Sequence, residues 1–94
     1  MSLFMLACFD KPESLDLRMA TREAHLAYVR ENAAAVKLAG PMLDEAEAMA
    51  GSLFILDVAD LAAARAFNAA DPYQSAGVFE RVEVRGFRAT LGSL

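Results

Sequence analysis

The sequence is poor in the side chains that bind metals or form disulfides. Its 94 residues include one cysteine, one histidine and no tryptophan. Cys8 has no partner for an intramolecular disulfide, and its position in the apolar run LFMLACF predicts a reduced thiol in the core. One histidine and one core cysteine form no ligand cluster, so we expect no metal site. The segment LAGPML lacks the spacing of the phosphate-binding glycine loops, and we expect no cofactor.

Basic residues and long apolar runs are also scarce. Nine Lys and Arg stand against thirteen Asp and Glu, and the net charge is -4. Nucleic-acid binding, which normally needs a basic stripe, is therefore not expected. No apolar run reaches the ~20 residues that span a bilayer, and Met1 leads into a strand-like segment without the basic start of a signal peptide. We expect a cytoplasmic protein that does not associate with membranes.

Hydrophobic residues are abundant, at 56% of the chain. Soluble domains usually have ~45–50%. A chain of this length predicts a single domain over residues 1–94, and a small domain with surplus apolar surface is often stabilised by association. We therefore expect a homodimer or a higher homo-oligomer.

The hydrophobic periodicity predicts four strands and two helices. Asp60 precedes the second helix and Thr21 the first, and each is expected to act as an N-cap. Residues 14–20 are expected to form a helical turn or loop, and residues 44–51 a loop. The predicted strands cover 3–9, 36–43, 52–58 and 79–87, and the helices cover 22–35 and 61–70.

This order, β-α-β-β-α-β, predicts an α+β protein of the ferredoxin-like class. Such a fold has a four-stranded antiparallel sheet with both helices on one face. The other face needs a cover, and a second subunit can supply it. The strand over 36–43 contains Gly40 and Pro41, and because proline has no amide proton, pairing there must end or lie at a sheet edge.

The helix over 61–70 runs into the segment DPYQSAG. Proline disfavours helical geometry in the residue before it, so Asp71 is expected to end the helix. His25 lies on the first helix, where a lone histidine is more often structural or exposed than functional. From these residues alone, neither side chain is assigned a role.

Four segments and their spacing resemble the YciI-like (YCII-related) family: DKPESLDLRMATREAHLAYV, LAGPML, GSLFIL and ARAFNAADPYQSAGVFERVEVRGF. The resemblance covers nearly the whole chain. It implies the dimeric α/β-barrel version of the ferredoxin-like fold. Members are proposed to carry a histidine and an aspartate in a pocket, by analogy with muconolactone-isomerase-like enzymes, and these fall here on His25 and Asp71. One relative is a dehydrochlorinase acting on a chlorinated hydroxyhydroquinone.

The resemblance leads to two hypotheses about function. In the first, His25 is a general base or acid and Asp71 orients it, for cofactor-independent isomerisation or elimination, including dehydrochlorination, on a small polar cyclic or aromatic substrate. In the second, the protein is a non-catalytic small-ligand-binding domain or an accessory subunit. Asp71 can then serve only as the start of an Asp-Pro turn.

Two arginines near His25 allow two interpretations. Guanidinium groups bind carboxylate or phosphate through paired hydrogen bonds, so Arg18 and Arg22 can bind an anionic group. The alternative is a set of surface salt bridges to Asp16 and Glu23, which contribute little. We favour the surface interpretation for Arg18 and leave Arg22 open as a substrate-binding candidate.

Four further residues are candidates for binding a substrate. Gly40 and Pro41 are expected to shape a strand end beside the pocket. Ser52 can offer a hydroxyl to a ligand, but it lacks the G-x-S-x-G setting of a nucleophile. Tyr73 can line the pocket with its ring and hydroxyl. For each of them, a purely structural role is at least equally compatible with the sequence.

Overall fold

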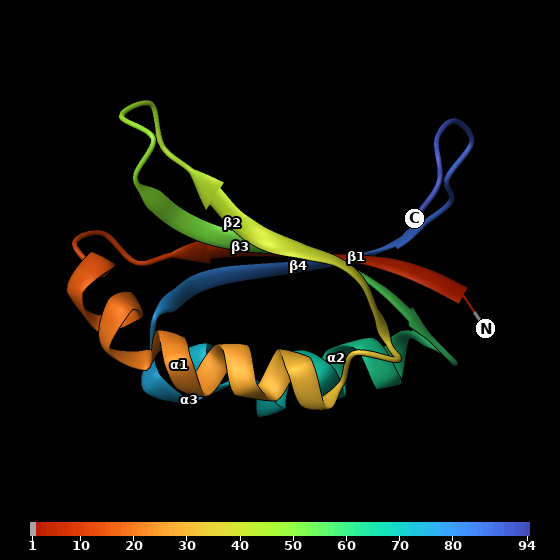
Figure 1. The fold of residues 1–94 in the computed structure, drawn as a ribbon, viewed down its shortest axis with the longest axis horizontal. Helices are drawn as coiled ribbons and strands as arrows, with labels where there is room; N and C mark the ends of the chain where they lie inside the picture. The colour runs from red at the N-terminus through yellow and green to blue at the C-terminus, as the bar shows by residue number, and fades with distance from the viewer. Residues whose placement is uncertain (1) are drawn as a thin grey trace.

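The computed structural model describes residues 2–94. These residues form four strands and three helices in the order β-α-β-β-α-α-β (Figure 1). The elements are β1 Ser2–Asp10, α1 Leu15–Glu31, β2 Val36–Leu43, β3 Met49–Val58, α2 Leu61–Ala70, α3 Pro72–Ala76 and β4 Phe79–Phe87. Apart from the short α3, this is the predicted order.

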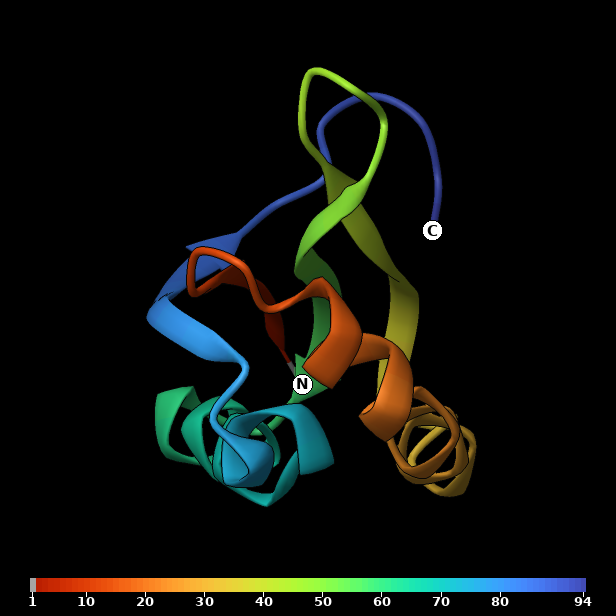
Figure 2. The same ribbon diagram turned by 90° about the vertical axis from the view of Figure 1, so that its left-hand side faces the viewer.

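The four strands form one antiparallel sheet in the order β2-β3-β1-β4. The three helices of the described chain lie on one face of this sheet, and no helix within residues 2–94 covers the opposite face (Figure 2). The predicted ferredoxin-like fold is confirmed. The tip of the β2–β3 hairpin and the C-terminal segment rise on the side away from the helices (Figure 1).

The core lies between the two central strands and the helices. Leu6 pairs with Phe54 and Cys8 with Ser52 across β1 and β3, and these side chains face the helical layer. Cys8 is fully buried, as predicted. Gly51 is required here, because a Cβ atom would lie 2.5 Å from the Cys8 carbonyl oxygen.

Helix α1 differs from its prediction at both ends. It begins at Leu15, so of the two alternatives for residues 14–20, a helical turn or a loop, the structure has the helical one, as the start of α1 itself. The Thr21 hydroxyl donates a hydrogen bond to the Leu17 carbonyl at 2.8 Å, which is the behaviour of a threonine inside a helix. The predicted Thr21 N-cap is therefore wrong. The helix ends at Glu31, and residues 32–35 form a turn.

The prediction for Gly40 and Pro41 is partly wrong. They do not end the strand, because β2 continues through both to Leu43. β2 is an edge strand, where the missing amide proton of a proline is tolerated. The loop predicted over 44–51 is shorter, since β3 already begins at Met49.

Helix α2 begins as the sequence predicts. The Asp60 side chain accepts a hydrogen bond from the Ala63 amide at 2.8 Å, which confirms it as the N-cap. Helix α3 follows α2 after a single residue, Asp71. It ends at Ala76 and is capped by Gly77, whose φ of 83° suits glycine. Within residues 2–94, no helix is both long and apolar enough to cross a membrane.

Candidate active site

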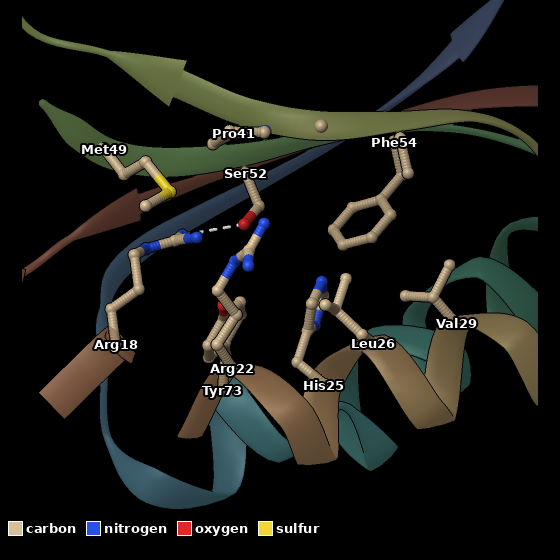
Figure 3. Close-up of a pocket in the computed structure, with 12 residues that line it drawn as sticks. Arg18, Arg22, His25, Leu26, Val29, Pro41, Met49, Ser52, Phe54 and Tyr73 are labelled. Atoms are coloured by element: carbon tan, nitrogen blue, oxygen red, sulfur yellow. Dashed lines mark hydrogen bonds between the residues drawn. The ribbon is translucent and has the colours of Figure 1, made fainter. Parts of the chain in front are cut away.

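A pocket of about 130 Å³ lies between α1 and the helix-facing side of β2 and β3 (Figure 3). Its walls combine apolar side chains with two arginines, one histidine, one serine and one tyrosine. The lining residues are Arg18, Arg22, His25, Leu26, Val29, Ala39, Gly40, Pro41, Met49, Ser52, Phe54 and Tyr73. Engineered cavities of ~150 Å³ hold a benzene molecule, so this pocket is large enough for about one six-membered ring.

His25 and Asp71 form a hydrogen-bonded pair in the wall of this pocket. Their Nδ1 and Oδ1 atoms are 2.8 Å apart, although 46 residues separate them in the chain. His25 is 8% exposed and Asp71 is fully buried. An ionised carboxylate only accepts hydrogen bonds, so in this contact the histidine donates its Nδ1 proton. The neutral ring then keeps a free lone pair on Nε2.

Two aromatic rings hold the imidazole in place. Tyr73 stacks on it with 4.0 Å between ring centroids and 17° between ring planes. Phe54 meets it edge-on, with centroids 5.8 Å apart. Together with the bond to Asp71, these contacts fix the orientation of the His25 ring. A proton-transfer group needs such a fixed orientation toward its substrate.

Asp71 also has a structural task. Its Oδ1 atom accepts a hydrogen bond from the Tyr73 amide at 2.9 Å, which makes Asp71 the N-cap of α3. The same oxygen therefore caps a helix and contacts His25. Among the described residues, the second oxygen, Oδ2, is buried without a hydrogen-bond partner. The helix stop at DPYQSAG thus does both things that the sequence left open, since it ends α2 and brings a carboxylate to the histidine.

Arg18 corrects an interpretation made from the sequence. It is 2% exposed and does not pair with Asp16 or Glu23 at the surface. Its Nε and Nη2 atoms donate to the two carboxylate oxygens of Asp10 at 2.7 and 3.1 Å, and Nη2 also donates to Ser52 Oγ at 2.7 Å.

The early start of α1 explains this error. Positions 18, 22, 25 and 29 lie on one face of a helix, and all four line the pocket. If the predicted helix had been extended back to residue 15, the spacing of Arg18 from His25 would have placed both on the same face. Asp10, at the end of β1, gave no comparable signal in the sequence.

The structure brings the other predicted binding residues together. Arg22, Ser52, Tyr73, Gly40 and Pro41 all line the pocket, and Asp71 lies behind His25 without lining it. The sequence interpretation missed six lining residues: Arg18, Leu26, Val29, Ala39, Met49 and Phe54. Those on β2 and β3 could not be selected, because the register of two strands decides which residues face α1.

Burial alters the acidity of several groups near the site. It raises the pKa of the Cys8 thiol to about 12, so the thiol stays protonated near neutral pH. Burial also raises the pKa of Tyr73, against a smaller lowering effect of the Arg18 and Arg22 charges. The pKa of Tyr28 is raised by burial and by the negative charge of Asp71. The tyrosines and the cysteine therefore remain neutral, and neither nucleophilic thiolate nor phenolate chemistry is favoured.

Comparison with known proteins decides the family. The model of the YCII-related domain matches residues 2–88. The chain belongs to the YCII-related family. Protein YciI of Escherichia coli O6:H1 is 37% identical over 94 residues, which span 92% of this chain and 96% of that protein. An uncharacterized protein of Haemophilus influenzae is 37% identical over 93 residues, which span 90% of this chain and 95% of that protein.

Solved structures of other proteins resemble the fold of this YCII-related chain. One is 5-chloro-2-hydroxyhydroquinone dehydrochlorinase (TftG) from Burkholderia phenoliruptrix, in complex with 2,5-dihydroxybenzoquinone. It has a TM-score of 0.84 and 30% identity, with 92% of this chain and 93% of that chain covered. An antibiotic biosynthesis monooxygenase has a TM-score of 0.59 at 16% identity, with 97% and 100% covered, and shares the fold alone.

Proposed function

We propose that the protein is a cofactor-independent enzyme that transfers a proton at carbon on a small cyclic or aromatic substrate. The observation that carries this proposal is the 2.8 Å contact between His25 Nδ1 and Asp71 Oδ1 in the wall of a pocket. A histidine held by a buried carboxylate is an arrangement suited to general acid–base catalysis.

The chemistry follows from the tautomer that Asp71 selects. With the Nδ1 proton donated to Asp71, Nε2 of His25 accepts a proton from a carbon atom of the substrate. The carboxylate stabilises the imidazolium that forms. The imidazolium then returns the proton to another atom, which completes an isomerisation, or the substrate expels a leaving group, which completes an elimination.

The similarity to the dehydrochlorinase supports elimination as one of these two reactions. That protein is 30% identical and is named for removing the elements of hydrogen chloride from a chlorinated ring. The pocket here has room for about one ring, and its apolar side chains exclude water from such a ligand. A six-membered ring with hydroxyl or carbonyl groups is the substrate that fits best.

The alternative is a small-ligand-binding domain or an accessory subunit without catalysis. A pocket filled by side chains, or a large distance between His25 and Asp71, would support this alternative. Neither feature is present, because the pocket is open and the pair is hydrogen-bonded. The geometry therefore favours the enzyme.

The proposal is tested by following proton exchange directly. The protein is incubated in D₂O with 2,5-dihydroxybenzoquinone, and loss of the ring hydrogen signal is measured by NMR. Chloride release from 5-chloro-2-hydroxyhydroquinone is measured in parallel. We expect acceleration over buffer, and a loss of about 10²–10⁴-fold in His25→Gln, which is the usual contribution of a general acid–base group.

A matched pair of variants isolates the role of Asp71. Asp71 and Asp60 each cap a helix through a side-chain oxygen, and asparagine is an equally good N-cap. We expect Asp71→Asn to lose activity and Asp60→Asn to keep it. Equal rates for His25→Gln and the parent would contradict the proposal. Ligand binding with no acceleration of either reaction would favour the non-catalytic alternative.

We also propose that the protein is a homodimer. The sheet face without helices carries apolar side chains, and Leu38 on β2 is 53% exposed. A second copy can cover this face. Sedimentation should give twice the 10.1 kDa mass of one chain, and Leu38→Glu should shift the equilibrium toward monomer. A monomeric parent at micromolar concentration would contradict the dimer.

The cytoplasmic location and the lack of nucleic-acid binding stay predictions.

A further inference from the structure

The charges around the pocket are not balanced. Its ionisable lining residues are Arg18, Arg22, His25 and Tyr73, and no Asp or Glu within residues 2–94 lines it. Asp10 neutralises Arg18, and Asp71 lies behind His25. Arg22 makes no hydrogen bond or ion pair within the described part of the chain. Arg22 is an exposed residue of α1, so water solvates its charge in the free protein, and this charge is available to a ligand in the pocket.

Ser52 adds a hydrogen-bond donor at the same place. Its Oγ atom accepts a hydrogen bond from Arg18 Nη2 at 2.7 Å, and it is 3% exposed. Because guanidinium only donates, the hydroxyl proton of Ser52 is not used in this contact. No other hydrogen bond of Ser52 occurs among the described side chains. A hydroxyl that accepts from a cation is polarised and donates its own proton more strongly.

Arg18 is held in a single geometry. Asp10 binds two of its nitrogens, and the Tyr73 ring lies 4.4 Å from its Cζ atom. Both Nη2 protons are committed, one to Asp10 and one to Ser52. Asp10 balances its charge, and the bond from Nη2 holds the Ser52 hydroxyl in position.

Figure 3 shows Ser52 and Arg22 reaching toward each other, from β3 and from α1. We propose that these two residues form an oxyanion subsite, that Arg18 and Asp10 position it, and that the pocket selects single rings bearing an ionised oxygen. The subsite specifies the substrate class of the proposed function. Its catalytic role rests on that function, whereas its role in binding does not. The shared ligand chemistry is an oxyanion on the ring, whether a carboxylate or an ionised hydroxyl.

The subsite also has a part in the proposed proton transfer. When His25 Nε2 removes a proton from a tetrahedral ring carbon conjugated with a carbonyl group, as in the keto tautomer of a hydroxylated ring, the C–H electron pair forms a new C=C bond. The π electrons of a conjugated carbonyl move to its oxygen and give an enolate. Ser52 and Arg22 would stabilise the charge that develops on that oxygen. The electrons stay within the substrate, so the step needs no oxidant or reductant.

A binding experiment tests the subsite without requiring turnover. The uniformly labelled protein is titrated near neutral pH with benzoate and with benzamide, which have similar shapes and differ in charge. We expect benzoate to bind about tenfold or more tightly than benzamide, because one hydrogen bond to a charged group contributes ~1.5–3 kcal/mol. Added salt should weaken the binding of benzoate only. Equal affinities, or no binding of benzoate up to its solubility limit, would overturn the proposal.

Variants separate the roles of the three residues. Arg22→Gln should lower the affinity for benzoate and leave that for benzamide unchanged. Ser52→Ala should lower the affinity for benzoate more than that for benzamide, because a hydrogen bond to a charged acceptor is stronger, and Ser52→Thr should restore the affinity. Arg30→Gln is the control, since Arg30 is an exposed residue of α1 that does not line the pocket. Arg18→Lys should reduce the ratio of the two affinities. An unchanged ratio in folded Arg18→Lys would assign Arg18 a structural role only and overturn its positioning role.

Two further measurements identify the preferred oxyanion and separate the subsite proposal from the enzyme proposal. Titration with 2,5-dihydroxybenzoquinone, whose hydroxyls ionise readily, shows whether an ionised hydroxyl binds more tightly than the benzoate carboxylate. His25→Gln should bind benzoate within about threefold of the parent, a difference below ~1 kcal/mol. Preference for benzoate without proton exchange would contradict the enzyme and leave the subsite standing. Proton exchange without any preference for anions would contradict the subsite and leave the enzyme standing.

Discussion

Replacement of Arg18 by methionine tests the most consequential difference between the sequence interpretation and the structure. Arg18 is 2% exposed, and the side chain of its partner Asp10 is 6% exposed. Three hydrogen bonds, at 2.7, 3.1 and 2.7 Å, join Arg18 to Asp10 and Ser52. Methionine keeps most of the apolar length of the side chain and removes its charge and all three donors.

The two interpretations predict different costs. Removing one partner of a buried ion pair costs about 3–5 kcal/mol, because the other charge stays buried without compensation. A surface salt bridge contributes only about 0–1 kcal/mol. We therefore expect Arg18→Met to lower the free energy of unfolding by about 3–5 kcal/mol. If Arg18→Met does not fold, the stability of Arg18→Lys is measured in its place. We expect this variant to lose less stability, because it keeps the positive charge.

The assay is urea unfolding followed by circular dichroism, with all variants at one protein concentration because association affects apparent stability. Arg65→Met is the control, since Arg65 is an exposed residue of α2 without an ion pair among the described residues. We expect it to change stability by less than about 0.5 kcal/mol. Combining Asp10→Asn with Arg18→Met should cost less than the sum of the single changes, because no buried charge is left alone.

Two results would refute this reasoning. A loss below about 1 kcal/mol in Arg18→Met would show that the pair is solvated, as a surface salt bridge is. Additive costs of Asp10→Asn and Arg18→Met would show that the two side chains do not interact energetically.

Three further predictions concern the core. Since burial raises the pKa of Cys8 to about 12, the unfolded thiol ionises first as pH rises above about 9, and this lowers stability by about 1.4 kcal/mol per pH unit. Because the pKa values of both tyrosines are also raised, the test is the difference between two proteins: by urea unfolding, the parent should lose about 1.4 kcal/mol per pH unit more than Cys8→Ala, and parallel curves would contradict this. Gly51→Ala should cost about 1–3 kcal/mol, because the new Cβ would lie 2.5 Å from the Cys8 carbonyl oxygen, whereas Gly40→Ala meets nothing within 4 Å and should be neutral. Tyr28→Phe removes a 2.7 Å hydrogen bond to the Phe67 carbonyl and should lower stability by about 1 kcal/mol in the same assay; an unchanged midpoint would show that this bond contributes nothing.

Local signals in the sequence were reliable where a single segment carries the information. Apolar runs placed the two central strands, and Asp60 marked the start of α2. These features depend on side-chain periodicity and on capping within a few residues. The boundaries of α1 were wrong because Thr21 is as compatible with a helix interior as with an N-cap, and only the bond to Leu17 distinguishes the two.

The sequence by itself determined the order of the four strands and the two longer helices, the ferredoxin-like class and, through the family resemblance, the His25 and Asp71 pair. Only the tertiary structure decided that Arg18 is buried against Asp10, that Ser52 accepts its hydrogen bond, and that Arg22 has no partner among residues 2–94. The physical reason is that these contacts join α1, β1 and β3, and their geometry depends on strand register and helix packing. Periodicity reports which face of an element is buried, but not which polar groups meet there.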